Sequence, residues 1–232
     1  MTNKDKSWEE LKEKNPWKEL FENKSIEELR KSICECNTEF VIQKDKTIIR
    51  NHNNDPKCKE PFVLFKLPKP FRGNLKDPKL VILSLNPGFN ERVNKTLFNI
   101  LDTKFQKDFI EICRNNLLLE DNCLVITPGV DDVCDNGYWT RQLSDLKKDG
   151  ANLSKIGLIQ FIPYASKNFD SWKDEANLES QKFTQNIIQR ILKESENTLF
   201  LIMRSKDKWE KLIGDEMKKY ESRFLYSRNP RC

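Results

Sequence analysis

Four short, nearly continuous apolar runs constrain the fold of this chain more than any other feature of its sequence. They occupy residues 79–85 (KLVILSL), 123–127 (CLVIT), 156–162 (IGLIQFI) and 198–203 (TLFLIM). Runs of this length and composition are typical of strands that are buried on both faces, as in a parallel sheet. A weaker run at residues 223–227 (RFLYS) is a fifth candidate strand.

Helical patterns lie between these runs, at residues 93–119, 139–149, 172–195 and 206–220. An alternation of strands and helices is typical of an α/β fold with a mainly parallel sheet. We therefore predict a three-layer sandwich whose central sheet has four to five mainly parallel strands.

The N-terminal part of the chain has a different pattern. Ser7 and Ser25 each begin a Ser-x-x-Glu pattern of the kind that opens helices, and Asn15-Pro16 separates the two helical stretches. We predict a helical N-terminal appendage over residues 1–50 and an α/β domain over residues 51–232.

Composition narrows the possible functions. Lys and Arg together number 41 and Asp and Glu 36, and the resulting net charge of +5 permits a polyanionic partner without requiring one. The seven cysteines form no CxxC pair and the seven glycines form no phosphate-binding motif, so we expect no metal and no nucleotide cofactor. The only histidine, His52, falls in the proline-interrupted stretch 51–78 and is expected in a loop.

Because no apolar stretch is long enough to span a membrane and no secretory signal is visible, we expect a cytoplasmic protein, which we take to be a monomer.

The residues that follow each run are the candidates for chemistry, because ligands of open α/β sheets bind at the carboxyl ends of the strands. Asn86-Pro87-Gly88 follows the first run. It is either an ordinary turn, in which Gly88 supplies a positive φ, or a site in which Asn86 holds a water or a substrate. Gln160 is the one polar residue inside the third run. Its amide either satisfies a nearby group of the protein or reads the edge of a planar, amide-like ligand.

Basic residues follow the later runs. Lys167 lies after the third, Arg204 and Lys206 after the fourth, and Arg231 after the last. They are either plain surface charges or contacts for an anionic partner. Because parallel strands all end at one edge of a sheet, we predict that these four cations form one phosphate-binding rim around Asn86.

Two short motifs resemble those of the uracil-DNA glycosylase superfamily, and the resemblance covers roughly residues 79–231. Leu85-Asn86-Pro87-Gly88 is similar to the first motif of the mismatch-specific and single-strand-selective branches, and residues 159–163 (IQFIP) are similar to the base-reading strand. The resemblance implies that Asn86 positions the attacking water. It also implies that Phe98 stacks on the base; the alternative is that this ring packs its helix against the hydrophobic core. The implied substrate-binding residues are Gly88, Phe89, Phe98, Gln160, Tyr164 and Asn229.

The function that the resemblance implies is hydrolysis of the N-glycosidic bond of a flipped-out pyrimidine in DNA, without a cofactor. In the uracil-specific branch a tyrosine near the position of Gly88 excludes groups on C5 of the base. A glycine there implies a bulkier, modified pyrimidine such as those of phage DNA, and hence a role in defence. The family's last motif, His-Pro-Ser, is replaced by Asn229-Pro230-Arg231, so its leaving-group histidine is absent. Two alternatives stay open: a nucleic-acid-binding module of the same fold without catalysis, and a hydrolase that uses Asp131 and Asp132.

Overall fold

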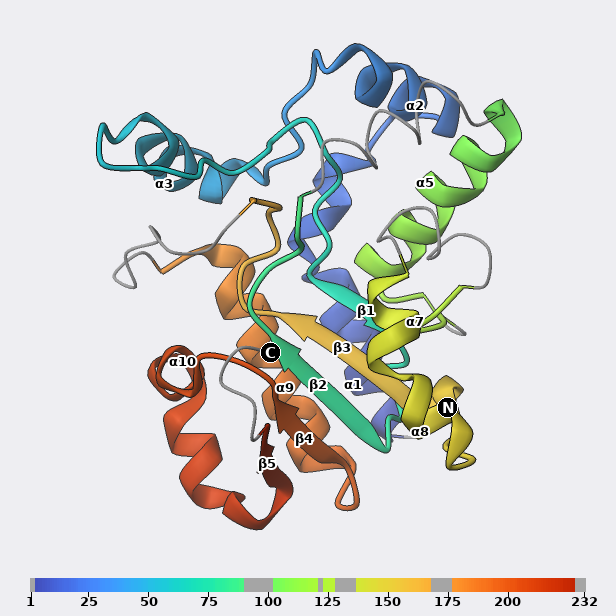
Figure 1. Ribbon diagram of the computed structural model, residues 1–232, viewed down its shortest axis with the longest axis vertical. Helices are drawn as coiled ribbons and strands as arrows, with labels where there is room; N and C mark the ends of the chain where they lie inside the picture. Colours follow the sequence, from blue (N-terminus) through green and yellow to red (C-terminus); the bar gives the residue numbers. More distant parts are fainter. Residues whose placement is uncertain (1–2, 90–101, 121–122, 128–136, 168–176, 228–232) are drawn as a thin grey trace.

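A computed structural model describes residues 3–89, 102–120, 123–127, 137–167 and 177–227 (Figure 1). It contains a five-stranded sheet in the order β1-β3-β2-β4-β5, in which β1 is antiparallel to β3 and the other neighbours are parallel. This sheet confirms the predicted α/β fold. The strands are β1 (Phe71–Gly73), β2 (Leu80–Ser84), β3 (Ile156–Gln160), β4 (Leu199–Ile202) and β5 (Phe224–Tyr226).

The helices lie largely where the sequence predicts them. The predicted capping box at Ser25 is confirmed, because the Glu28 amide donates to the Ser25 hydroxyl while the Ser25 amide donates to the Glu28 carboxylate. The helices are α1 (Asn3–Glu13), η1 (Pro16–Leu20), α2 (Ile26–Glu35), α3 (Gln43–Asn54), α5 (Thr103–Leu117), α7 (Tyr138–Gln142), α8 (Ser144–Lys148), η2 (Leu153–Lys155), α9 (Glu179–Glu194), α10 (Lys206–Lys219) and η3 (Glu221–Arg223).

Two local predictions in the N-terminal region are wrong. Ser7 does not cap a helix, because α1 begins upstream of it and the Ser7 hydroxyl instead donates to Glu194 at 2.7 Å. His52 is not in a loop but in the last turn of α3, where its ring packs against Phe62.

The sheet separates two hydrophobic cores, because successive side chains of a strand point to opposite faces. Val81 and Leu83 of β2 belong to the larger core together with residues of α9 and α10, whereas Ile82 belongs to a smaller core with Trp139 of α7. In Figure 1, α7 and α8 lie in front of the sheet and α9 lies behind it. The arrangement is the three-layer sandwich that the apolar runs predict.

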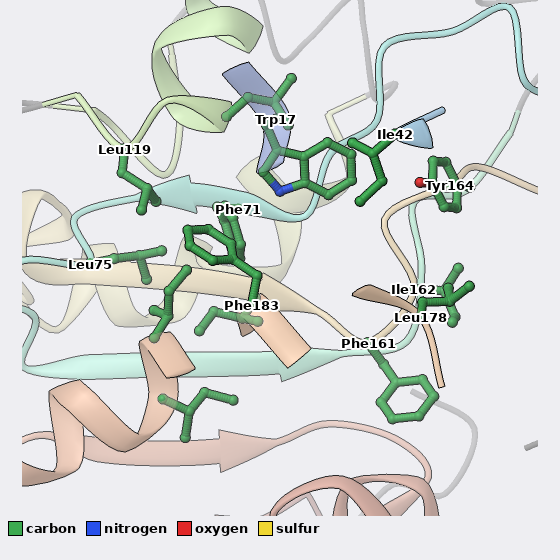
Figure 2. Close-up of a cluster of buried hydrophobic side chains, with 14 of the residues drawn as sticks. Trp17, Ile42, Phe71, Leu75, Leu119, Phe161, Ile162, Tyr164, Leu178 and Phe183 are labelled. Atoms are coloured by element: carbon green, nitrogen blue, oxygen red, sulfur yellow. The ribbon is translucent and has the colours of Figure 1, made fainter. Parts of the chain in front are cut away.

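The N-terminal helices share the larger core with the sheet. Trp8, Trp17 and Leu29 are buried in the same cluster as Phe71 of β1 and Phe183 of α9, and Figure 2 shows Trp17 above Phe71. The core is thus continuous across residue 50. The division of the chain at that residue stays a prediction.

One predicted strand is wrong and one strand was missed. Residues 123–127 form no strand; Val125 is instead buried in the smaller core, against the face of the sheet. The edge of the sheet beside β3 is formed by β1, a three-residue strand that follows Pro68 and Pro70. Prolines of this kind are tolerated beside an edge strand, which is why the loop-rich pattern concealed β1.

Across the described parts of the chain, every helix is too short or too polar to cross a bilayer.

Candidate functional site

Asn86 lies just beyond the carboxyl end of β2, at the topological switch point of the sheet. The chain leaves β2 to form β3 on one side, and it leaves β4 to form β5 on the other. Connections that diverge in this way leave a crevice beyond the strand ends, where α/β proteins bind their ligands. The main chain continues the pairing past β2, since the Phe161 amide donates to the Ser84 carbonyl and the Ile162 amide to the Leu85 carbonyl.

Ser166, which the sequence analysis did not single out, fixes the orientation of Asn86. Asn86 Nδ2 donates to Ser166 Oγ at 2.9 Å and to the Pro87 carbonyl at 3.2 Å. Ser166 is only 1% exposed, so its hydroxyl is held in place by its surroundings. Among the described residues none donates a hydrogen bond to Asn86 Oδ1, and Asn86 itself is partly exposed. The amide therefore has a fixed nitrogen and an oxygen that can accept a hydrogen bond from a water or a ligand.

The main chain joins the loops after β2 and β3 at this serine. Gly88 and Ser166 form a parallel bridge, the Ser166 amide donates to the Pro87 carbonyl, and the Phe89 amide donates to the Ser166 carbonyl at 3.0 Å. The only sequence signal for Ser166 was its place in the polar turn that ends the third run.

Gly88 is not needed for a left-handed backbone, so that part of the turn prediction is wrong. Its φ is not among the positive values of the chain, because the bridge to Ser166 keeps the backbone extended. A Cβ built on Gly88 would meet no described atom within 4 Å. Glycine at this position thus leaves a space around its own Cα that no described atom fills, and it does not relieve backbone strain.

Gln160 ends β3 directly opposite Ser84 of β2. The alternation along β3 places its side chain on the face of Ile156 and Leu158, which is the face covered by α7. The residue is 4% exposed, and Oε1 has no hydrogen-bond partner in the described part of the chain. A buried acceptor without a partner costs about 1–3 kcal/mol, so a polar ligand that donated to it would recover that energy.

Three of the predicted DNA-binding cations follow strand ends at the same edge as Asn86. Lys167 is exposed and follows Ser166, while Arg204 is exposed and follows β4. Lys206 opens α10, with Nζ 3.2 Å from Glu210 and 4.7 Å above the Tyr226 ring. The hydrogen bond to Glu210 raises the pKa of Lys206.

Tyr164 is a core residue rather than the substrate-binding residue that the sequence analysis predicted. It is 1% exposed, and Figure 2 shows it in the cluster with Ile42 and Trp17. Its hydroxyl donates to Asp45 at 2.9 Å. Burial raises its pKa, and the neighbouring Asp45 carboxylate raises it further. The hydroxyl is therefore engaged within the protein.

Phe89, another predicted substrate-binding residue, lies in a small cluster at the site. Its ring is 6.4 Å from that of Phe65 in an edge-to-face arrangement, and Lys66 Nζ lies 4.6 Å from its centroid. Phe65 and Lys66 come from the loop-rich stretch before the sheet, where no sequence signal marked them. Other candidates fall outside the described residues: Phe98, Asp131, Asp132, Asn229 and Arg231.

No metal-binding cluster occurs within the described ranges. A cavity of about 390 Å³ exists, but its lining includes Gly73, which ends the antiparallel strand β1 opposite Gly157, and Asn74, so it lies at the opposite edge of the sheet from Asn86. The chain matches no protein-family model, no curated protein and no solved structure.

Proposed function

We propose that this protein is a DNA glycosylase that hydrolyses the N-glycosidic bond of a flipped-out, modified pyrimidine and leaves an abasic site. The observation that carries the proposal is the orientation of Asn86. Its amide stands at the switch point of the sheet, with Nδ2 tied to the buried Ser166 and Oδ1 left to accept a hydrogen bond. The Asn-Pro-Gly resemblance supports the same role.

The chemistry needs little from the protein beyond position. As the glycosidic bond breaks, positive charge develops on the sugar, and a cationic sugar accepts a weak nucleophile. Asn86 Oδ1 then has only to hold a water on the correct side of the sugar, and a preorganised polar group is suited to that task. A target base reaches such a site only after it leaves the stack, at a cost of a few kcal/mol. The mechanism uses no metal or organic cofactor.

The neighbours of Asn86 suggest the substrate class. The buried Oε1 of Gln160, to which no described residue donates a hydrogen bond, is suited to accept one from an N–H on the base edge. The space beside Gly88, which no described atom fills, has room for a C5 substituent larger than the hydrogen atom of uracil. A modified pyrimidine of foreign DNA fits both features, which is why we extend the proposal to antiviral defence.

The second candidate is a nucleic-acid-binding module of the same fold without catalysis. The observation that favours it is the position of the only histidine. His52 Nε2 lies 3.4 Å from Cys58 Sγ, and the ring packs against Phe62. The one imidazole of the chain therefore contacts residues of the loop after α3.

The test separates the two candidates. Oligonucleotides that each carry a different pyrimidine, plain or modified at C5, are incubated with the protein and then treated with alkali to cleave abasic sites. We expect cleavage of at least one modified substrate, and we expect Asn86→Ala to reduce it at least ~100-fold. Asn37→Ala, which alters an exposed asparagine after α2, is the matched control and is expected to be fully active. Binding without cleavage of any DNA would favour the inactive module.

A further inference from the structure

Tyr164 lies two residues before Ser166, in the short turn that carries the hydroxyl on which Asn86 depends. The Tyr164 ring is 1% exposed. Two other rings meet it edge to face, that of Trp17 at 6.2 Å and that of Phe62 at 6.3 Å. Because protein interiors are close-packed, the ring cannot move independently of the residues around it.

Asp45 of α3 holds the hydroxyl end of the Tyr164 side chain. The hydroxyl donates to Asp45 Oδ2 at 2.9 Å, and the same carboxylate accepts from the Ser180 hydroxyl and from the Glu179 amide at the start of α9. Asp45 is completely buried, so its acceptor oxygens are not readily replaced by a water. The position of Tyr164 is therefore set by α3 and α9 together.

The main chain between Tyr164 and Ser166 has little freedom to absorb a displacement of the ring. The Ala165 carbonyl accepts a main-chain hydrogen bond at 2.8 Å. The Ser166 amide donates to the Pro87 carbonyl, and the Ser166 carbonyl accepts from the Phe89 amide. Because each residue spans at most about 3.6 Å, a shift at Tyr164 is passed on to Ser166 over a short and constrained piece of chain.

We propose that Asp45 and Tyr164 are positioning residues of the Asn86 site. They hold the Ser166 hydroxyl where it accepts from Asn86 Nδ2, and they thereby set where Asn86 Oδ1 points. The inference deepens the proposed function and rests on it for the reaction that the amide serves. Position matters for that reaction, because a displacement of about 1 Å can cost about 100-fold in rate. Residues of the N-terminal helices thus contribute to the reaction through the orientation of Asn86.

The first test reads the Asn86 side-chain amide directly and needs no substrate. Nuclear magnetic resonance measures how fast its N–H protons exchange with water, and the resonances are assigned by their loss in Asn86→Ala. We expect Tyr164→Phe to speed this exchange about 5-fold, the factor that one ordinary hydrogen bond contributes. A partly exposed side chain exchanges through local opening, so a loss of global stability alone does not change the rate.

The matched control is Tyr220→Phe, which removes a hydroxyl in the same way. Tyr220 follows α10 and precedes β5, so it lies at the opposite edge of the sheet from Asn86, where its ring packs against the larger core. Exchange of the Asn86 amide in this variant should equal that of the wild type.

The second test follows kcat and KM for abasic-site formation. Tyr164→Phe should lower kcat about 10-fold and leave KM nearly unchanged. In a Ser166→Ala background the same substitution should lower kcat by less than about 2-fold, because its effect passes through the Ser166 hydroxyl. Asp45→Ala should speed exchange of the Asn86 amide as Tyr164→Phe does, and Tyr164→Phe decides the test if Asp45→Ala does not fold.

The outcomes separate this inference from the proposed function. Unchanged exchange in Tyr164→Phe, an equal rise in Tyr220→Phe, or a full further loss of kcat in the Ser166→Ala background would overturn the positioning role, even if the protein makes abasic sites. Faster exchange in Tyr164→Phe, in a protein that makes no abasic sites on any DNA, would remove the glycosylase and leave the positioning of Asn86 standing. Circular dichroism confirms that each variant is folded.

Discussion

Replacing Asp45 by alanine tests the buried hydrogen-bond network that joins α3, α9 and the turn after β3. The Asp45 side chain is completely buried. Its carboxylate accepts from Tyr164 Oη at 2.9 Å, from Ser180 Oγ at 2.5 Å and from the Glu179 amide at 2.7 Å. The Glu179 amide and, at 3.4 Å, the Ser180 amide are backbone donors at the start of α9 that have no partner within the helix, so Asp45 acts as an N-cap supplied by another helix.

The size of the effect follows from the donors that Asp45→Ala leaves behind. The donors of the three shortest hydrogen bonds to Asp45 lose their acceptor, and each such loss costs about 1–3 kcal/mol. Because some of them can relax or reach a water, we expect a total near the low end of the sum, about 3–5 kcal/mol. A change of 1 kcal/mol shifts the melting temperature of a chain of this size by about 2–4 °C. The variant should therefore melt about 10–15 °C below the wild type.

Thermal and urea unfolding, followed by circular dichroism, measure this loss. Asp215→Ala is the matched control, because Asp215 is exposed on α10 and its loss should leave stability within about 0.5 kcal/mol. Tyr164→Phe removes a single hydrogen bond of the network and should cost about 1 kcal/mol. A loss below about 1 kcal/mol in Asp45→Ala would refute the role that we assign to the network.

The network also predicts a dependence on pH. Burial raises the pKa of Asp45, and hydrogen bonds from Ser180 and Tyr164 oppose that shift only in part. A folded-state pKa above the unfolded value means that the stabilising contribution is present below the unfolded pKa and is lost as pH rises through the folded pKa. Asp45→Asn does not titrate, so its destabilisation relative to the wild type should be larger near pH 4 than near pH 7. A gap that widens as pH rises would contradict this reasoning.

Three further predictions concern other residues. Ser166→Ala removes the hydroxyl that orients Asn86, so the kcat of abasic-site formation should fall about 10-fold while KM stays nearly unchanged. The free energy of unfolding should fall by about 1 kcal/mol. A change in KM alone would contradict a positioning role. Gln160→Leu removes a buried acceptor that has no partner among the described residues, so the melting temperature should stay level or rise while the base preference changes; easy unfolding with an unaltered preference would show that this amide is structural. Arg30 and Lys107 lower the pKa of Glu27 to about 2, so the contribution of Glu27 to folding stability is present above its unfolded-state pKa and is lost as pH falls toward 2. Glu27→Gln should therefore make the free energy of unfolding depend less on pH in that range. An unchanged pH dependence would show that these ion pairs do not contribute.

The sequence by itself was sufficient to predict the parallel strands. A strand that is buried on both faces must be apolar at nearly every position, so β2, β3 and β4 stand out as continuous runs. The place of Asn86 followed from the same pattern, because it is the first strongly polar residue beyond β2. The same rule failed for residues 123–127, since burial alone demands apolar residues whether the segment is a strand or a covering loop.

What only the tertiary structure decided is which distant groups meet. Asn86 and Ser166 are 80 residues apart, and Tyr164 and Asp45 are 119 apart. The sequence showed polar residues at each place but not their partners. Such pairs depend on strand order and on the register of neighbouring loops, which are set by the packing of the whole chain. The turn that contains Tyr164, Ser166 and Lys167 has the same local sequence pattern whichever of the three faces the core. Only the fold shows that Tyr164 packs in the core while Ser166 orients Asn86.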